Sequence, residues 1–288
     1  MKLSCADFTW PLLPHEKVLE LIHLLDLDGV DIGFFGNRSH IRPEVVREDV
    51  PQWAGMLNER LARTQVELAD LYYQPWSDFP TMAPNNPDPK QQADSDALFE
   101  TVLEFGRRLK TPGITMLPGV RFGNESDEVS IRRSAEKLKQ RVNQAKHLGM
   151  ELSVEGHVGS NVDTPDKLGR LVELTPGLTL TLDYTHYTFA GFKDSEMEPL
   201  IKYARHFQIR GAAKGRLQAN FNESSIDHVR MMKKIKETGY DRWIGLEYVW
   251  VNWQDCNRSE NVSETIQLRD QVRAAWAGRV YEPLALSV

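Results

Sequence analysis

The chain has 288 residues, of which 41% are hydrophobic and 26% charged, and its formal net charge is −6. This length suits one large α/β domain or two small ones, and the acidic charge gives no sign of a general affinity for nucleic acid. No apolar run approaches the roughly 20 residues of a membrane helix, and the N-terminus lacks a signal peptide's apolar core, so we expect a cytoplasmic protein. The two cysteines, Cys5 and Cys256, fit no metal-binding or redox spacing.

The first half of the chain alternates β-rich runs with helical patterns. A long proline-rich stretch, 74–89, interrupts this alternation, and irregular loops of such length are usually functional or mobile. The expected strands are 2–8, 28–36, 66–73 and 113–119, and the expected helices are 14–25, 43–63 with a break at Pro51, and 90–109.

The second half continues the same alternation. We expect the residues after Asp183 to form a loop that carries His186, and Ser259 to cap the last helix. The expected strands are 151–155, 178–183, 206–210 and 243–248, and the expected helices are 127–147, one from about 164, 195–204, 225–238 and 259–277.

Eight β-α units at a mean repeat of about 36 residues predict a closed (β/α)8 TIM barrel. No linker or change of composition divides the chain, so we expect a single domain over 1–288 with a short tail from about residue 278. No GxGxxG follows the first strand, which removes the main sign of a dinucleotide-binding alternative.

Four consecutive expected strands end in a polar residue: Glu155, Asp183, Gln208 and Glu247. The active sites of such barrels lie at the carboxyl ends of the strands, where these side chains would meet. Three converging carboxylates repel one another unless a cation lies between them, and oxygen ligands suit Mg, Mn or Co better than zinc, which stays an option. This interpretation fails if the carboxylates of Glu155 and Glu247 lie more than about 10 Å apart. We expect His206, one layer deeper, to be a satisfied interior histidine and not a ligand.

Four motifs give the chain a more specific resemblance: SVEGH, TLDYTH, HFQIRGAAKGRLQ and GLEYVW. In them, and over nearly its whole length, the chain resembles the xylose isomerase-like TIM-barrel superfamily. That superfamily includes sugar and sugar-phosphate isomerases and epimerases, inosose dehydratase and endonuclease IV. The resemblance implies an ion held by Glu155, Asp183, Gln208 and Glu247. Gln208 stands where the family normally has a histidine, and an amide is a weaker ligand than imidazole for transition metals.

The resemblance also implies an activity, the isomerisation or epimerisation of a sugar or sugar phosphate through an enediolate. Glu155 and Glu247 would serve as base and acid. The loops 72–89 and 250–258 would form an aromatic lid over the site. We expect a basic cluster after the seventh strand to hold an anionic group. The expected substrate-binding residues are His157, His186, Arg210, Lys214 and Arg216.

Two alternatives stay open at this point. One is an inosose-type dehydratase, a lyase with the same enolate chemistry, and the other is a catalytically inactive homologue that lost its metal because Gln208 replaces histidine. An endonuclease is disfavoured, because it needs a histidine-rich site and a basic surface, and the chain is acidic with eight histidines. The expected partner is a small sugar-like substrate, with no nucleic acid and no membrane; a homo-oligomer is compatible with the sequence but not required by it.

Overall fold

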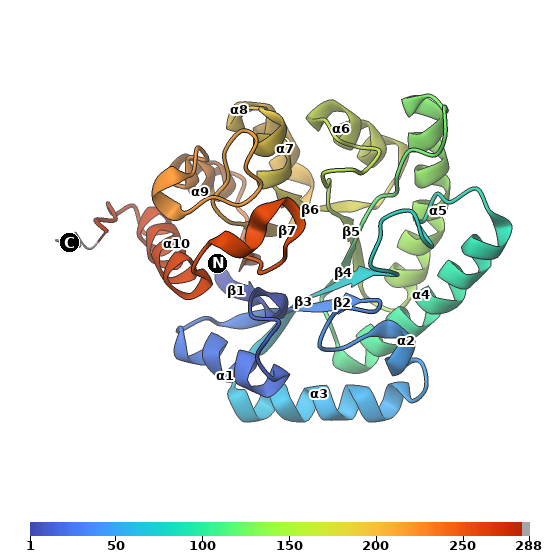
Figure 1. The fold of residues 1–288 in the computed structure, drawn as a ribbon, viewed down its shortest axis with the longest axis horizontal. Coiled ribbons are helices and arrows are strands. Elements are labelled where there is room, and N and C mark those ends of the chain that lie inside the picture. Colours follow the sequence, from blue (N-terminus) through green and yellow to red (C-terminus); the bar gives the residue numbers. More distant parts are fainter. Residues whose placement is uncertain (284–288) are drawn as a thin grey trace.

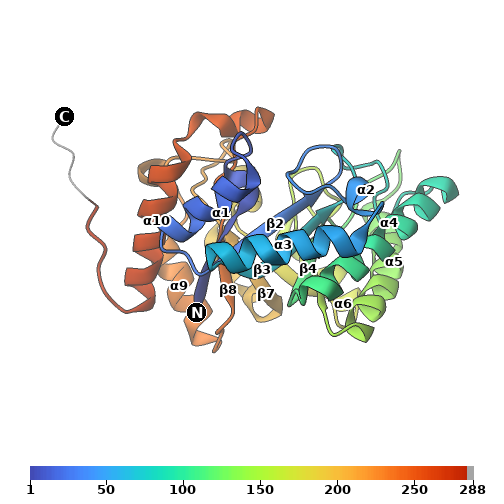
Figure 2. The same ribbon diagram turned by 90° about the horizontal axis from the view of Figure 1, so that it is seen from below.

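The structure, a computed structural model, describes residues 1–283 as a closed barrel of eight parallel strands in the order β1 to β8. Figure 1 shows the strands surrounded by a ring of helices, and Figure 2 shows α3 to α6 lying along the outside of the strands. The predicted (β/α)8 barrel is therefore confirmed. The predicted tail from about residue 278 lies partly outside the described residues. None of the helices in the described range is both long and apolar enough to cross a membrane.

The observed strands agree with the predicted ones to within a few residues at each end. Strands β5 and β8 stop one residue before their glutamates, which places those side chains at the start of the following loops. The strands are β1 Lys2–Ala6, β2 Gly29–Phe35, β3 Glu67–Gln74, β4 Gly113–Met116, β5 Glu151–Val154, β6 Thr179–Asp183, β7 Ala204–Ile209 and β8 Trp243–Leu246.

The helices begin at side chains that accept backbone N–H groups, such as Asp88 before α4, Ser126 before α5 and Thr164 before α6. Asp227 likewise caps α9 by accepting the Arg230 N–H. The helices are α1 His15–Leu24, α2 Pro43–Val46, α3 Val50–Thr64, α4 Pro89–Leu109, α5 Asp127–His147, α6 Pro165–Leu174, α7 Thr185–Ala190, α8 Asp194–Met197, α9 His228–Glu237 and α10 Asn261–Trp276, with 3-10 turns at Asp7–Thr9, Glu198–Tyr203, Phe221–Glu223 and Trp253–Arg258.

Four local predictions need correction. The break expected at Pro51 falls instead at residues 47–49, between α2 and α3, and Pro51 lies in the first turn of α3, where a missing N–H costs nothing. His186 lies on the short helix α7 and not in a loop, and the predicted helix 195–204 is α8 followed by a 3-10 turn. The side chain that caps α10 belongs to Glu260 and not to Ser259.

The main hydrophobic core fills the space between the barrel and the helices, as the alternation along the strands predicts. Each fully buried aliphatic side chain contributes roughly 1.5–3 kcal/mol to the burial free energy. The outward-facing core residues of the last four strands are Leu152, Val154, Leu180, Leu182, Phe207, Ile209, Ile244 and Leu246, all 2% exposed or less.

The barrel interior below the strand ends is polar. The pairing of β6 with β7 skips a residue, Arg205, and this bulge lets both Arg205 and His206 reach groups inside the barrel. Arg205 pairs with Asp70 at 2.7 Å, and His206 pairs with Asp31 at 3.0 Å. His206 is thus an interior histidine with a partner, as expected, and we call these four residues the lower layer.

Candidate active site

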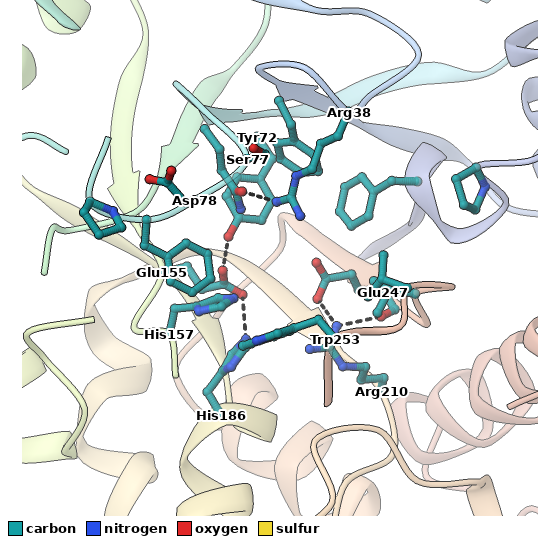
Figure 3. A pocket seen from close by; sticks show the side chains of 18 residues that line it. Arg38, Tyr72, Ser77, Asp78, Glu155, His157, His186, Arg210, Glu247 and Trp253 are labelled. Atoms are coloured by element: carbon teal, nitrogen blue, oxygen red, sulfur yellow. Dashed lines mark hydrogen bonds and ion pairs between the residues drawn. The ribbon is translucent and has the colours of Figure 1, made fainter. Parts of the chain in front are cut away.

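The carboxylates of Glu155, Asp183 and Glu247 converge above the lower layer. Each offers an oxygen that lies within 4.8 Å of the oxygens of the other two, and all three side chains are buried. Their separation is well below the 10 Å that would have excluded a shared site. Figure 3 shows Glu155 and Glu247 approaching the pocket from different sides.

Gln208 reaches the same level from β7 and is fully buried. Neither polar atom of its amide has a hydrogen-bond partner within residues 1–283. A buried amide without partners carries a desolvation penalty of about 1–3 kcal/mol for each unsatisfied group. The Gln208 amide therefore needs a hydrogen-bond or metal partner that the described protein atoms do not supply.

Arg210 supplies a positive charge within the carboxylate group. Its Nη1 donates to Glu247 Oε2 at 2.5 Å and to the Glu247 carbonyl at 2.9 Å, and its Nη2 lies 3.7 Å from Asp183 Oδ2. Burial alone would lower the pKa of Arg210, but Glu247 and Asp183 outweigh it and the pKa is raised. One guanidinium leaves three carboxylates only partly neutralised.

The excess of negative charge acts on the two glutamates. Burial, followed by repulsion from Asp183, raises the pKa of Glu155 to about 8. Burial also raises the pKa of Glu247 well above its usual range, against the opposing effect of Arg210. Carboxyl groups with such shifts are suited to proton transfer near neutral pH.

Two histidines lie beside Glu155, with their ring centroids 4.1 Å apart. Burial lowers the pKa of His186 to about 4 and that of His157 well below its usual value, so both rings are neutral at pH 7. Because His186 Nδ1 accepts the Val158 N–H, its proton lies on Nε2, which is 3.6 Å from Glu155 and 3.4 Å from Asp183. His157 donates from Nδ1 to the Val158 carbonyl, which leaves its Nε2 free to accept a hydrogen bond.

A cavity of about 470 Å³ is lined by five of these groups, Glu155, His157, His186, Arg210 and Glu247, whereas Asp183 and Gln208 are not among its lining residues. The Tyr72 hydroxyl donates to Glu155 and also faces this cavity. The two loops that were expected to cover the site both contribute to its wall. The lining side chains from these loops are Ser77, Asp78, Phe79, Pro80, Val251 and Trp253.

The three basic residues expected to form one cluster occupy different environments. Arg210 is buried among the carboxylates, whereas Lys214 and Arg216 are exposed and do not line the cavity. Arg216 instead pairs with Glu223 at 3.1 Å. The structure therefore does not bring the three side chains together at the cavity, and that of Lys214 lies instead near Gly191, just after α7.

The donor set fits a divalent cation. Three buried carboxylates and one buried amide oxygen match the oxygen-rich ligation of Mg or Mn, and the unpartnered Gln208 amide is the observation that calls for such a partner. A second group of donors, Glu155, His157 and His186, shares one carboxylate with the first and offers the nitrogen ligands that zinc accepts. The structure thus allows either kind of ion at Glu155.

From the sequence, Arg38 could equally reach the site or belong to a capped turn, and Tyr72 was expected only at the start of the lid; both line the cavity. Tyr72 lies two residues beyond Asp70 on the inward face of β3, so the two-residue period of the strand could have identified it. Arg38 lies in the loop after β2, where no pattern fixes the direction of a side chain. Trp253, in the expected lid loop 250–258, stacks on His157 with ring centroids 5.2 Å apart.

Comparisons with known proteins agree with this geometry. A family model described as xylose isomerase-like TIM barrel matches residues 19–272. The structure of D-psicose 3-epimerase from Clostridium cellulolyticum H10 with D-tagatose superposes with a TM-score of 0.76 at 13% identity, covering 96% of this chain and 99% of that one. The structure of the IolI protein with a bound zinc atom superposes with a TM-score of 0.72 at 16% identity, covering 98% of this chain and 100% of that one.

A third similar structure is the probable 3-DHS dehydratase AsbF from Bacillus anthracis, with a TM-score of 0.70 at 13% identity, covering 94% of this chain and 100% of that one. No curated protein sequence matches the chain. At these identities the structural likeness establishes the fold.

Proposed function

The chain belongs to the xylose isomerase-like TIM-barrel family, and from this we propose that it is a divalent-metal-dependent isomerase or epimerase of a sugar or sugar phosphate. The observation that carries the proposal is the convergence of Glu155, Asp183 and Glu247 within 4.8 Å beside the unpartnered Gln208. The similar structures of sugar epimerases support the choice of substrate class.

Glu155, Asp183, Gln208 and Glu247 would hold the ion. When bound, the ion would polarise the substrate carbonyl and stabilise negative charge on its oxygen. His157 and His186 would orient the substrate through hydrogen bonds. His157 Nε2 would accept a hydrogen bond from a substrate hydroxyl, and His186 Nε2 would donate one to a substrate oxygen. The aromatic side chains of the wall would exclude water from the reacting atoms.

One glutamate would remove the proton from the carbon next to the carbonyl, and the electron pair would move onto the carbonyl oxygen to give an enediolate. The other glutamate would return a proton to the opposite face of that carbon, which inverts its configuration. Return of the proton to the neighbouring carbon would instead exchange aldose and ketose. Glu155 and Glu247 suit these roles because both line the cavity and approach it from different sides.

The test is solvent deuterium exchange at the carbon next to the carbonyl, followed by NMR on a panel of ketoses with Mn, Mg or Co. We expect Glu155→Gln and Glu247→Gln each to lower the exchange rate roughly 10²- to 10⁴-fold. Glu151→Gln is the matched control, since Glu151 begins β5, the strand that Glu155 directly follows, and pairs with Arg242 at the other end of the barrel. Exchange that survives both active-site substitutions would refute the acid-base assignment.

A dehydratase is the second candidate, favoured by the Tyr72 hydroxyl. This group contacts Glu155 and faces the cavity, where it could protonate a departing hydroxyl. Following both epimer formation and loss of water on cyclic polyol ketones would separate the two activities. Tyr72→Phe is expected to abolish dehydration while leaving deuterium exchange measurable.

A further inference from the structure

Arg38 differs from the other arginine of the cavity in having no charged partner. Its guanidinium lies over the Phe35 ring at 4.7 Å and donates to the Gln74 side-chain oxygen. No carboxylate of residues 1–283 comes within 4.0 Å of Arg38, whereas Arg210 is paired with Glu247. Figure 3 shows Arg38 on the side of the pocket opposite His186 and Arg210.

The loop that carries Arg38 is held in place by its backbone contacts. A Cβ at Gly36 would lie 2.2 Å from the Pro75 carbonyl oxygen, so this position tolerates only glycine. Asn37 adopts a left-handed conformation with φ 64°, and its N–H donates to Glu44 at 3.0 Å. Ser39 Oγ accepts the Phe35 N–H and donates to the Ile41 carbonyl. Arg38 is itself exposed, but the fixed turn, the Phe35 ring and the hydrogen bond to Gln74 hold its guanidinium at the wall of the cavity.

The charges around the cavity indicate which kind of group Arg38 would bind. With the ion of the proposed function bound, Arg210 and the divalent cation together neutralise Glu155, Asp183 and Glu247. Arg38 and Asp78 are then the remaining charged side chains among the described lining groups. The Asp78 carboxylate accepts hydrogen bonds from the Thr81 N–H and hydroxyl of its own loop, whereas Arg38 has no carboxylate within 4.0 Å among residues 1–283.

We propose that Arg38 recognises an anionic group of the substrate, and that this group is the carboxylate of a sugar acid. The proposal rests on the proposed function, because the ion supplies part of the charge compensation. The planar guanidinium of Arg38 matches a carboxylate through two parallel hydrogen bonds, which favours a carboxylate as the anionic group. A cavity of about 470 Å³ falls within the usual range for small-molecule sites and leaves room for such a group beyond the reacting carbons.

The test compares three probes of matched carbon skeleton with the manganese-loaded protein: D-fructose, D-fructuronate and D-fructose 6-phosphate. Binding is measured by calorimetry, and KM and kcat are measured by deuterium exchange. For the wild-type protein we expect D-fructuronate to bind roughly ten- to a hundredfold more tightly than D-fructose. Arg38→Met should remove this preference through KM with little change in kcat, and Arg38→Lys should retain part of it because the charge is kept.

Arg42→Met is the matched control, since Arg42 is exposed, lies near Arg38 in the same loop and does not line the cavity. An Arg38-dependent preference for D-fructose 6-phosphate alone would support the anion site and identify its group as phosphate. An equal loss of binding affinity for all three probes in Arg38→Met would show that Arg38 has a structural role and would overturn the proposal. If no probe exchanges deuterium, the proposed function fails by that measurement, while the calorimetric comparison still decides whether Arg38 selects anions.

Discussion

Two layers of buried charge lie one above the other inside the same barrel. In the lower layer, Arg205 is bound by Asp70, Thr115 and Ser153, and His206 is bound by Asp31. In the layer above it, which contains Glu155, Asp183, Gln208, Arg210 and Glu247, three carboxylates share one guanidinium. There the unpartnered atoms include Glu155 Oε1, both amide atoms of Gln208 and Arg210 Nε.

The difference separates a structural network from a binding site. Each charged group of the lower layer has an opposite partner, and among the described residues that layer leaves only His206 Nδ1 without a hydrogen bond. Native structures leave few buried polar groups unsatisfied, and a concentration of them at the carboxyl ends of barrel strands indicates that a ligand completes the site. Both layers bury charged side chains. They differ in how many of those side chains have an oppositely charged or hydrogen-bonded partner.

The largest expected effect comes from removing one carboxylate from each layer. Asp70→Asn leaves Arg205 buried without an opposite charge and should lower the free energy of unfolding by about 3–5 kcal/mol. Glu155→Gln relieves repulsion and keeps an acceptor for Tyr72, so the free energy should change by less than about 1 kcal/mol. Urea unfolding of the metal-free variants measures both, with Glu67→Gln, exposed on the same strand as Asp70, as control. Equal losses for the two variants would remove the distinction between the layers.

The second prediction concerns acid sensitivity around the upper layer. Burial lowers the pKa values of His186 and His228 to about 4, and His228 Nε2 donates to the Arg210 carbonyl at 3.2 Å. Between about pH 6.5 and 4 the unfolded chain binds protons that these folded histidines do not, so their contribution to stability falls as pH falls through this window. The raised pKa values of Glu155 and Glu247 act in the opposite direction, so the histidine contribution is obtained by comparison with a variant. Each histidine contributes a loss of about 3 kcal/mol at pH 4.

Unfolding free energies of the metal-free protein at pH 7, 6, 5 and 4.5 would measure this loss. His228→Gln keeps a donor for the Arg210 carbonyl but does not titrate, so its curve should be flatter than that of the wild type. Parallel curves for the two proteins would show that His228 is not held neutral by the fold.

The smallest expected effect is on metal affinity. Gln208→His restores an imidazole at the fourth ligand position, and Arg210→Met removes the cation that competes for Glu247 and Asp183. Each substitution should tighten manganese binding roughly tenfold, or about 1.4 kcal/mol, by calorimetry. Manganese binding only in Gln208→His would favour the inactive homologue. Weaker binding in Arg210→Met would show that the arginine supports the ion and does not compete with it.

The sequence was sufficient to predict the barrel and the four polar strand ends, because both follow from the two-residue period of strands and from β-α alternation. It could not predict Arg205 as an interior residue, since strict alternation places it on the outer face and only the bulge in β7 turns it inward. The position of His186 at the site was expected, but its helix was not, because six residues are too few for a helical period to show.

Side chains on loops were harder to place than those on strands. Lys214 and Arg216 were expected at the site from their nearness to β7 in the sequence, yet neither side chain lines the cavity. Arg38 is far from the catalytic strands in the sequence and reaches the cavity through a turn fixed by contacts with Pro75 and Glu44. Such contacts arise between separate β-α units, and no local pattern in either unit encodes them.

The cavity draws its groups from two parts of the chain that are separate in the sequence. The carboxylates, Gln208 and Arg210 come from β5 to β8 and their ends, whereas Phe35, Arg38 and Tyr72 come from β2 and β3. Gly36 packs against Pro75, so the turns after these two strands form one interlocked unit. Evolution or protein engineering could therefore exchange that N-terminal unit to change the preferred substrate, while the reaction chemistry of the C-terminal half is inherited intact.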